Sequence, residues 1–391
     1  MLIIRILIVF LLINLKSFGQ LSPHAKVYLL TCDPGDEIYT QFGHSAIRIV
    51  DKEASLDNVY NWGMFEFDED ETAFMMKFAR GKLPYYMGVQ SFDGFMAEYI
   101  YFNRTVRQLE LNLNQAQTNE LFAALQINYL PENRVYKYDF FFDNCASRIR
   151  DFFVKVVGES LELGKHNDAD LFSYRTIITP RLTDHSWTHF GINLVLGARI
   201  DAYVTNDNLM FLPEYMEQIF LLSHVNVEGK KVPFVLSQET IFEGAKIEEK
   251  SSLFFTPNIL AWSIFGLIVL LLFFKWNKSL RVLGMVLIFS TSLLGLILLL
   301  MWFATDHQAT KMNYNLIWAN PVLIILPFLM LTTAMFKRMY YVFRTVAFIH
   351  LSFIVMWIFL PQEFDLPTKG LILAQGLLFY AWQKESKGIK I

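Results

Sequence analysis

Cys145 has the surroundings of a nucleophilic cysteine. An Asp-Asn pair precedes it, and it opens a stretch in which Cys145, Ile149, Phe152 and Val156 recur at the spacing of one helical face. Because Asp and Asn are favoured N-cap residues, we predict that a helix starts at residue 143 or 144 and carries the thiol in its first turn. The positive end of the helix dipole lowers the pKa of a thiol at that position and favours the thiolate.

The sequence contains one other cysteine, Cys32. Both cysteines lie in the part of the chain that we expect to be exported, so a single Cys32–Cys145 disulfide is a second interpretation. The two interpretations exclude each other, because a disulfide would consume the nucleophile.

A cysteine nucleophile needs a base, and His44 is the histidine with the most informative surroundings. It follows a glycine at the start of a run of alternating character that predicts a strand. In such a strand His44 and Arg48 share the face opposite the isoleucines at positions 47 and 49. A histidine and an arginine on that face are typical of a cleft lining, and a surface histidine beside an arginine is the alternative.

The next segment with strand character, residues 58–65, contains Asn61. A polar side chain on a strand beside His44 can hold the imidazole in one tautomer, as the third member of a catalytic triad does. Asn61 is our candidate for this role. An asparagine near a strand end is also typical of a turn, so a turn residue is the alternative.

The composition requires two kinds of environment. Of the 391 residues 54% are hydrophobic and 18% are charged, which is too apolar for one water-soluble body. The apolar residues concentrate after residue 255. The net charge of -3 gives no basic surface for nucleic acid. The sequence has no nucleotide-binding fingerprint and no close pair of metal ligands, so we expect neither a metal nor another cofactor.

Five apolar segments near the C-terminus are candidates for membrane-spanning helices. Basic residues cluster between the first and second, between the third and fourth, and after the fifth, which predicts a cytoplasmic C-terminus. Residues 1–19 have the pattern of a signal peptide or of an uncleaved anchor. We therefore expect a periplasmic domain over residues 20–255 and a transmembrane domain over residues 256–391 in the bacterial inner membrane. The segments are residues 258–274, 282–303, 317–336, 346–360 and 371–383.

Several motifs occur in a fixed order along the chain. They are Thr31-Cys32-Asp33-Pro34-Gly35, Tyr39, Phe42-Gly43-His44-Ser45-Ala46-Ile47-Arg48, Tyr60-Asn61-Trp62-Gly63, Asp143-Asn144-Cys145 with Arg148, Thr305-Asp306-His307 and Asn313-Tyr314-Asn315. Together they resemble the Lnb family, the apolipoprotein N-acyltransferases of Bacteroidota. That family has a periplasmic domain ahead of a multi-spanning membrane domain, and the resemblance covers nearly the whole chain.

A more distant resemblance is to circularly permuted NlpC/P60 enzymes, which are papain-like and include the lecithin:retinol acyltransferase group. In that group a histidine on a strand precedes an Asn-Cys pair at a helix start, as His44 precedes Cys145 here. The group has a second histidine as its third residue, whereas the next histidine here is His166. The resemblances imply an α+β papain-like exported domain followed by an all-α transmembrane domain of about five helices.

Both resemblances imply acyl transfer through a cysteine thioester. Cys145, with His44 as base, would take an acyl chain from a membrane phospholipid and pass it to the α-amine of a diacylated lipoprotein. The phospholipid, the lipoprotein and the inner membrane are the expected partners. A membrane-anchored peptidase or amidase acting on peptidoglycan would use the same two residues, and a non-enzymatic sensor would carry the disulfide.

Six further residues are candidates for substrate binding. Arg48 or Arg148 would hold the phospholipid phosphate, because a guanidinium pairs bidentately with that anion. A solvated helix face is the alternative for Arg148. His307 and Asn315, in the loop between the second and third spans, would contact lipid headgroups unless they form a plain interfacial loop. The other two, Ser45 and Tyr39, lie in the motifs that resemble the family.

Overall fold

The computed structural model describes residues 19–35, 37, 40–66, 70–182, 186–245 and 255–388. The chain divides into two compact units, each assembled from separate stretches of sequence. The expected signal peptide lies outside the described residues, apart from its last position. The first unit comprises Met1–Glu66, Pro84–Asn167 and Asn206–Lys246, and the second comprises Phe67–Leu83, Asp168–Thr205 and Ile247–Ile391.

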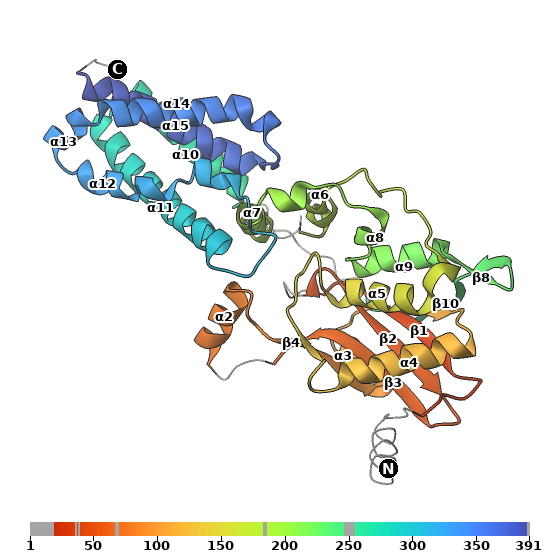
Figure 1. Cartoon of the computed structure of the whole chain (residues 1–391). Coiled ribbons are helices and arrows are strands. Elements are labelled where there is room, and N and C mark those ends of the chain that lie inside the picture. The colour runs from red at the N-terminus through yellow and green to blue at the C-terminus, as the bar shows by residue number, and fades with distance from the viewer. Residues whose placement is uncertain are drawn as a thin grey trace, which may run out of the picture. The chain divides into compact units, whose positions relative to one another are not determined.

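The first unit is built on an antiparallel sheet. Among the described residues its strand order is β10-β5-β1-β2-β3-β4-β6. Strands β1, β2, β3, β4 and β10 of this sheet are labelled in Figure 1. A smaller sheet has the order β7-β8-β9. The α+β class expected for this part of the chain is confirmed. The strands are β1 (Lys26–Cys32), β2 (His44–Asp51), β3 (Leu56–Met64), β4 (Tyr85–Ser91), β5 (Val106–Leu111), β6 (Val135–Tyr136), β7 (Leu161–Glu162), β8 (His224–Val227), β9 (Lys230–Pro233) and β10 (Val235–Phe242).

Helices cover both faces of the large sheet. On one face Val59 of β3 shares a core cluster with Phe95 of α3 (Phe92–Tyr101). Successive strand residues point to opposite faces, so Tyr60 points to the other face. There its hydroxyl accepts a hydrogen bond from Gln126 of α4 (Gln115–Tyr129). The helix α5 (Cys145–Val157) contacts α4, and α9 (Pro213–Leu222) contacts α5.

Gly43 makes the turn that leads into β2. Its φ of 75° lies in the left-handed region, and a Cβ at this position would be 2.7 Å from the carbonyl oxygen of Cys32. Only glycine fits such a turn without strain. The turn sets the register in which His44, the first residue of β2, pairs with Cys32, the last residue of β1.

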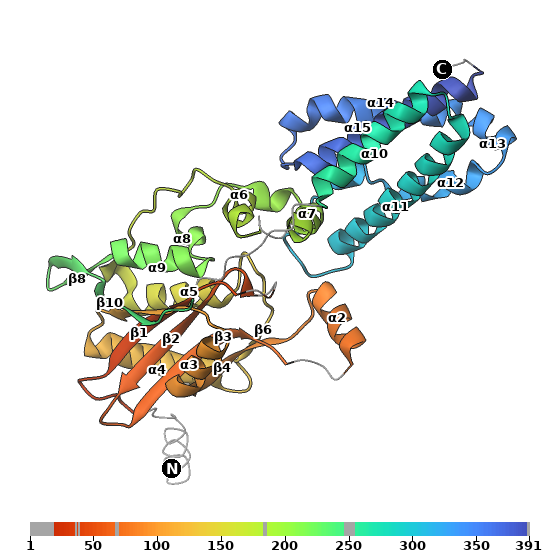
Figure 2. The same ribbon diagram turned by 180° about the vertical axis from the view of Figure 1, so that it is seen from behind.

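The second unit is helical, as expected for the C-terminal part (Figure 2). Four helices, α10 (Pro257–Phe273), α11 (Asn277–Phe303), α14 (Tyr340–Met356) and α15 (Leu366–Ser386), share a cluster of buried apolar side chains. These helices overlap four of the expected segments, with ends that differ by up to six residues. Two helices of the described chain, Asn277–Phe303 and Tyr340–Phe359, are long and apolar enough to cross a membrane, and two shorter apolar helices accompany them.

The expected third span, residues 317–336, does not form one continuous helix. Pro321 and Pro327 begin new helical turns, because proline lacks the backbone N–H that would continue the hydrogen-bond ladder, and Thr332 caps another helix. The resulting short elements are η5 (Tyr314–Ile317), η6 (Pro321–Ile325), α12 (Leu326–Leu329) and α13 (Thr333–Arg338).

The expected boundary at residue 255 does not separate the two units, because residues 168–205 pack with the C-terminal part. The backbone N–H of Gly197 donates to the carbonyl of Ala309 over 2.9 Å. The side-chain amide of Asn313 donates to the carbonyl of Leu194 over 2.7 Å. These bonds join α7 (Ser186–Val195) and the residues after it to the loop that follows α11.

The helix α2 (Glu71–Ala79), which lies in sequence between β3 and β4, also belongs to the second unit. The N–H of Asp306 donates to the carbonyl of Arg80 over 3.0 Å, and Nε2 of His307 donates to the carbonyl of Phe78 over 3.1 Å. The end of α2 is thereby fixed to the loop after α11. The exposed large apolar side chains of this helix are Met75, Met76 and Phe78.

Candidate active site

Cys145 is the first residue of α5, in agreement with its sequence context. Asn144 is the N-cap: its side chain accepts from the N–H of Ser147, whose hydroxyl accepts in turn from the N–H of Asn144. The Asn144 side-chain amide also donates to the carbonyls of Phe140 and Phe211. These bonds hold the first helical turn, and with it the thiol, in one position.

The buried face of α5 differs by one position from the expected one. Ile149 and Phe153 are fully buried and Val156 is nearly so, whereas Phe152 is only half-buried. Phe152 packs instead against Trp62 of β3, with 5.2 Å between the ring centroids. The helix α5 therefore contacts β3 through Phe152, beside its buried face.

The Cys145 thiol lies against β2. Burial raises the pKa of this thiol, and the backbone N–H groups of Ser45, Ala146 and Cys145 oppose that effect without overcoming it. The sequence favoured a thiolate, since the helix dipole lowers a thiol pKa, but desolvation outweighs the dipole here. The thiol is protonated at neutral pH and needs a base to become a nucleophile.

His44 and Asn61 are hydrogen-bonded, with 3.1 Å between Nε2 of the imidazole and Oδ1 of the amide. Asn61 pairs with Ala46 in the β2–β3 register and is therefore a diagonal neighbour of His44 on the same sheet face. Because an amide oxygen only accepts hydrogen bonds, the neutral ring carries its proton on Nε2. The lone pair of Nδ1 is therefore free to accept a proton, so Nδ1 can act as a base.

The His44 ring is half-buried, and it is neutral at physiological pH. Burial lowers the pKa of His44 to about 4; the hydrogen bond to Asn61 raises this pKa, and the positive charge of Arg104 lowers it further. At neutral pH the imidazole and the Cys145 thiol are therefore both neutral, and they do not form an ion pair.

Ser45 connects the thiol to the histidine. It follows His44 directly, and its backbone N–H is directed at the Cys145 sulfur. The β2–β3 register begins at Ala46 and Asn61, so Ser45 lies just beyond that pairing. The Ser45 side chain is fully buried, and its hydroxyl has no hydrogen-bond partner within the described chain. The structure thus places the Cys145 thiol against the residue that follows His44, and it joins His44 to Asn61 by a hydrogen bond.

The two arginines expected to hold a phosphate are both paired with carboxylates. Nε and Nη2 of Arg48 donate to the two carboxylate oxygens of Asp57 over 2.8 and 2.7 Å. Nε and Nη2 of Arg148 donate to the carboxylate of Asp143 over 2.6 and 2.8 Å. The bidentate face of each guanidinium is already occupied, so neither side chain offers the phosphate site that the sequence suggested.

Three further expected residues are Tyr39, His307 and Asn315. Tyr39 is not among the described residues. His307 and Asn315 belong to the second unit. Asn315 is buried, its amide nitrogen donates to Leu194 over 3.1 Å, and its oxygen accepts from the indole N–H of Trp318 over 2.8 Å. Asn315 therefore supports the loop, and a role of either residue in lipid binding stays a prediction.

Three residues near the site were missed in the sequence. Tyr136 and Tyr138 have pKa values raised by burial and, secondarily, by the charge that Cys145 acquires on ionising. The two tyrosines are two residues apart in a strand-like run shortly before Asn144, and this spacing could have placed both on the same face of a strand. Arg104, whose charge acts on His44, had no such signal, because it is distant in sequence from both His44 and Cys145.

Both cysteines are free thiols, which contradicts the disulfide interpretation. Burial raises the pKa of Cys32 to about 12, so this second thiol stays protonated and unreactive at neutral pH. Within the described ranges no group of three or more His, Cys, Asp or Glu side chains could hold a metal ion.

Replacing Asn61 by alanine is expected to slow acylation of Cys145 by a nitrophenyl ester about 10²-fold, because the imidazole loses the partner that fixes its orientation and tautomer. Asn61→Asp keeps an acceptor and adds a negative charge, so it should retain more activity than Asn61→Ala. The charge should raise the pKa of His44 and so move the acidic limb of the pH profile to higher pH. Single-turnover rates between pH 4 and pH 8 measure both effects. Equal losses in both variants with an unmoved limb would contradict the positioning role.

Comparison with known proteins gives two matches to family models. The model of the Lnb N-terminal periplasmic domain matches residues 19–179, and the model of the Lnb transmembrane domain matches residues 248–382. The first match includes Cys145, His44 and Asn61, and the second includes α10, α11 and α14. No curated protein and no solved structure matched the chain.

Proposed function

Because the chain belongs to the Lnb family, with a periplasmic N-terminal domain and a transmembrane domain, we propose that it is a lipoprotein N-acyltransferase of the bacterial inner membrane. It moves an acyl chain from a phospholipid to the α-amine of a diacylglyceryl-cysteine at a lipoprotein N-terminus. The observation that carries this proposal is the Cys145 thiol held against the N–H of Ser45, the residue that directly follows His44, whose ring is hydrogen-bonded to Asn61.

The first half-reaction acylates the enzyme. Nδ1 of His44 takes the thiol proton as the Cys145 sulfur attacks an ester carbonyl of the phospholipid. The tetrahedral intermediate then collapses, the bond from the acyl carbon to the glycerol oxygen breaks, and His44 returns the proton to that oxygen. The products are an acyl-thioester on Cys145 and a lysophospholipid.

The second half-reaction transfers the acyl chain. The α-amine of the lipoprotein attacks the thioester carbonyl, a C–N bond forms and the C–S bond breaks. His44 takes a proton from the amine and delivers it to the leaving thiolate of Cys145. The enzyme returns to the neutral pair from which it began.

Two kinds of donor support an oxyanion at the acyl carbon. Backbone N–H groups at the start of α5 lie around the Cys145 sulfur. The Tyr136 hydroxyl is buried and has no hydrogen-bond acceptor in the described part of the chain, so its proton is available. A single such donor typically contributes a factor of about 10²–10³ to the rate.

The membrane domain is part of the proposed mechanism, because both substrates are lipids that stay in the bilayer. We retain five membrane passes, a cytoplasmic C-terminus and a permuted NlpC/P60, papain-like arrangement as parts of the proposal. The exposed apolar side chains of α2, fixed to the loop after α11, support contact with the lipid headgroup region.

A double substitution of Met75 and Phe78 by aspartate is expected to lower the rate with vesicle phospholipid about tenfold or more, because two apolar side chains no longer enter the interface. The rate with a soluble nitrophenyl ester should be unchanged. Thr72→Asp, which adds a charge to the first turn of the same helix, serves as the control. Loss of activity toward the soluble ester as well would mean that α2 supports folding and not membrane contact.

The proposed activity is tested with the full-length protein in phospholipid vesicles and a synthetic diacylated lipopeptide. We expect release of lysophospholipid and a gain of one acyl chain on the peptide amine, measured by mass spectrometry, with Cys145→Ala as the inactive control. Purified peptidoglycan fragments form the second arm. Cleavage of these fragments without lysophospholipid would favour the peptidase or amidase alternative and overturn the proposal.

A further inference from the structure

Arg104 is a buried arginine whose charge has no carboxylate partner among the described residues. It follows α3 and is 8% exposed. Its Nε donates to the backbone carbonyl of Asp33 over 2.8 Å, and its guanidinium carbon lies 4.8 Å from the ring centroid of Tyr99. Its Nη2 is buried and makes no hydrogen bond within the described ranges.

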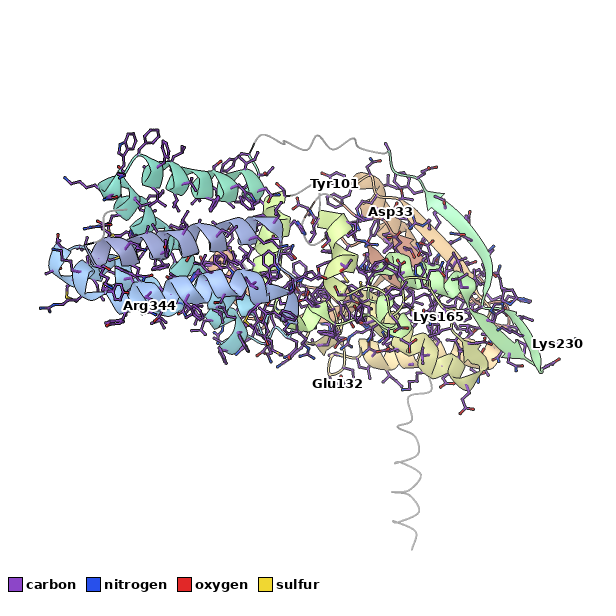
Figure 3. All side chains as sticks on the ribbon, turned by 90° about the horizontal axis from the view of Figure 1, so that it is seen from above. Asp33, Tyr101, Glu132, Lys165, Lys230 and Arg344 are labelled. Atoms are coloured by element: carbon purple, nitrogen blue, oxygen red, sulfur yellow. The ribbon has the colours of Figure 1, made fainter. Side chains whose placement is uncertain are left out.

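The neighbouring carboxylate is committed elsewhere. The side chain of Asp33, which is labelled in Figure 3, accepts from Nη1 of Arg107 over 2.6 Å. Arg107 also pairs with Glu217 over 3.0 Å. A buried guanidinium without a counter-charge is costly, and the cost is removed when an anion binds to it. The free nitrogen of Arg104 therefore indicates an anion site.

This site lies beside the base. Cys32 and His44 are register partners, so their side chains share one face of the sheet, and Arg104 acts electrostatically on both. The amide nitrogen of Asn61, whose oxygen binds His44, is also buried without a partner in the part of the chain described here. Each of these two nitrogens is a donor that an acceptor oxygen of a ligand would satisfy.

We propose that Arg104 binds the phosphate of the phospholipid donor and thereby directs its ester carbonyl to Cys145. The inference rests on the proposed acyl transfer. A guanidinium with a free N–H matches phosphate oxygens, and the two arginines first expected in this role, Arg48 and Arg148, are engaged with carboxylates. In a glycerophospholipid only the glycerol separates the phosphate from the ester, so a donor held by its phosphate presents its ester carbonyl nearby.

Two donors with identical acyl chains test this role: phosphatidylglycerol, and diacylglycerol, which lacks the phosphate. Both are presented to the full-length protein in detergent micelles, and the acyl-thioester on Cys145 is measured by intact-protein mass spectrometry. The wild-type protein is expected to react about 10- to 100-fold faster with phosphatidylglycerol, as one charge-assisted hydrogen bond allows. Arg104→Gln should abolish this preference. Arg104→Lys, which keeps the positive charge but lacks the paired N–H donors of a guanidinium, should reduce it. Arg48→Gln is the matched control and should keep the preference.

Equal slowing of both donors by Arg104→Gln would show that the residue only supports the fold, and an unchanged preference would remove it from donor binding. A measurement without turnover separates this inference from the proposed activity. The phosphorus-31 resonance of glycerophosphoglycerol should broaden on addition of the Cys145→Ala protein, but not of the Cys145→Ala/Arg104→Gln protein. Broadening in the absence of any wild-type thioester would support the anion site and count against acyl transfer. Thioester formation without broadening and without donor preference would overturn the anion site alone.

Discussion

Cys145→Ala is expected to abolish thioester formation and lipoprotein N-acylation, with a loss of about 10⁴-fold or more, because the proposed acyl-thioester forms on the Cys145 sulfur. The variant should still fold, since the Asn144 cap and the buried face of α5 remain. Lysophospholipid release by the purified protein and mass spectrometry of a lipoprotein N-terminus in cells measure the loss.

Cys32→Ala is the matched control for this experiment. Burial raises the Cys32 pKa to about 12 and keeps this thiol protonated, so its removal should cost some stability but leave the rate per folded molecule near the wild-type value. Acylation lost with Cys32→Ala and kept with Cys145→Ala would sink the assignment of the nucleophile.

The rate of enzyme acylation is expected to be constant from about pH 6 to pH 8 and to fall only as the pH approaches the His44 pKa of about 4. The sign follows from the lowered pKa: His44 stays neutral, and so remains a base, until the pH drops through this value. The first half-reaction must be followed by itself, as the single-turnover release of lysophospholipid, because the acceptor α-amine titrates near pH 8.

His44→Ala is expected to slow the same step about 10²- to 10⁴-fold and to remove the acidic limb. An acidic limb near the ordinary histidine pKa of about 6.5 would contradict a desolvated base. Rapid alkylation of Cys145 at pH 5 would contradict the neutral pair, because it would require a preformed thiolate.

Local patterns in the sequence predicted the backbone of the site well. A cap residue before a helical apolar face located the start of α5 to within one residue, and a glycine before an alternating run located the start of β2 at His44. These features depend on neighbours within a few positions, so a single stretch of chain contains the required information. The apolar segments that became α10, α11, α14 and α15 were predictable for the same reason.

Interactions between distant segments decided what the local patterns left open. Arg48 looked free in the sequence, but Asp57 on the neighbouring strand β3 occupies its guanidinium group. The third apolar segment looked continuous, but its prolines divide it. Residues 168–205 have no sequence feature that links them to the C-terminal part, but they belong to the second compact unit, and their backbone groups bond to the loop after α11.

The sequence by itself determined that a cysteine starts a capped helix, that a histidine starts a strand, and that the C-terminal part is a membrane domain. Only the tertiary structure decided the protonation of Cys145 and His44, the hydrogen bond between His44 and Asn61, and the lack of a hydrogen-bond partner for Nη2 of Arg104 among the described residues. The physical reason is that backbone conformation follows short-range pattern, whereas pKa values and ion pairs depend on the burial and charge that remote segments bring to a side chain.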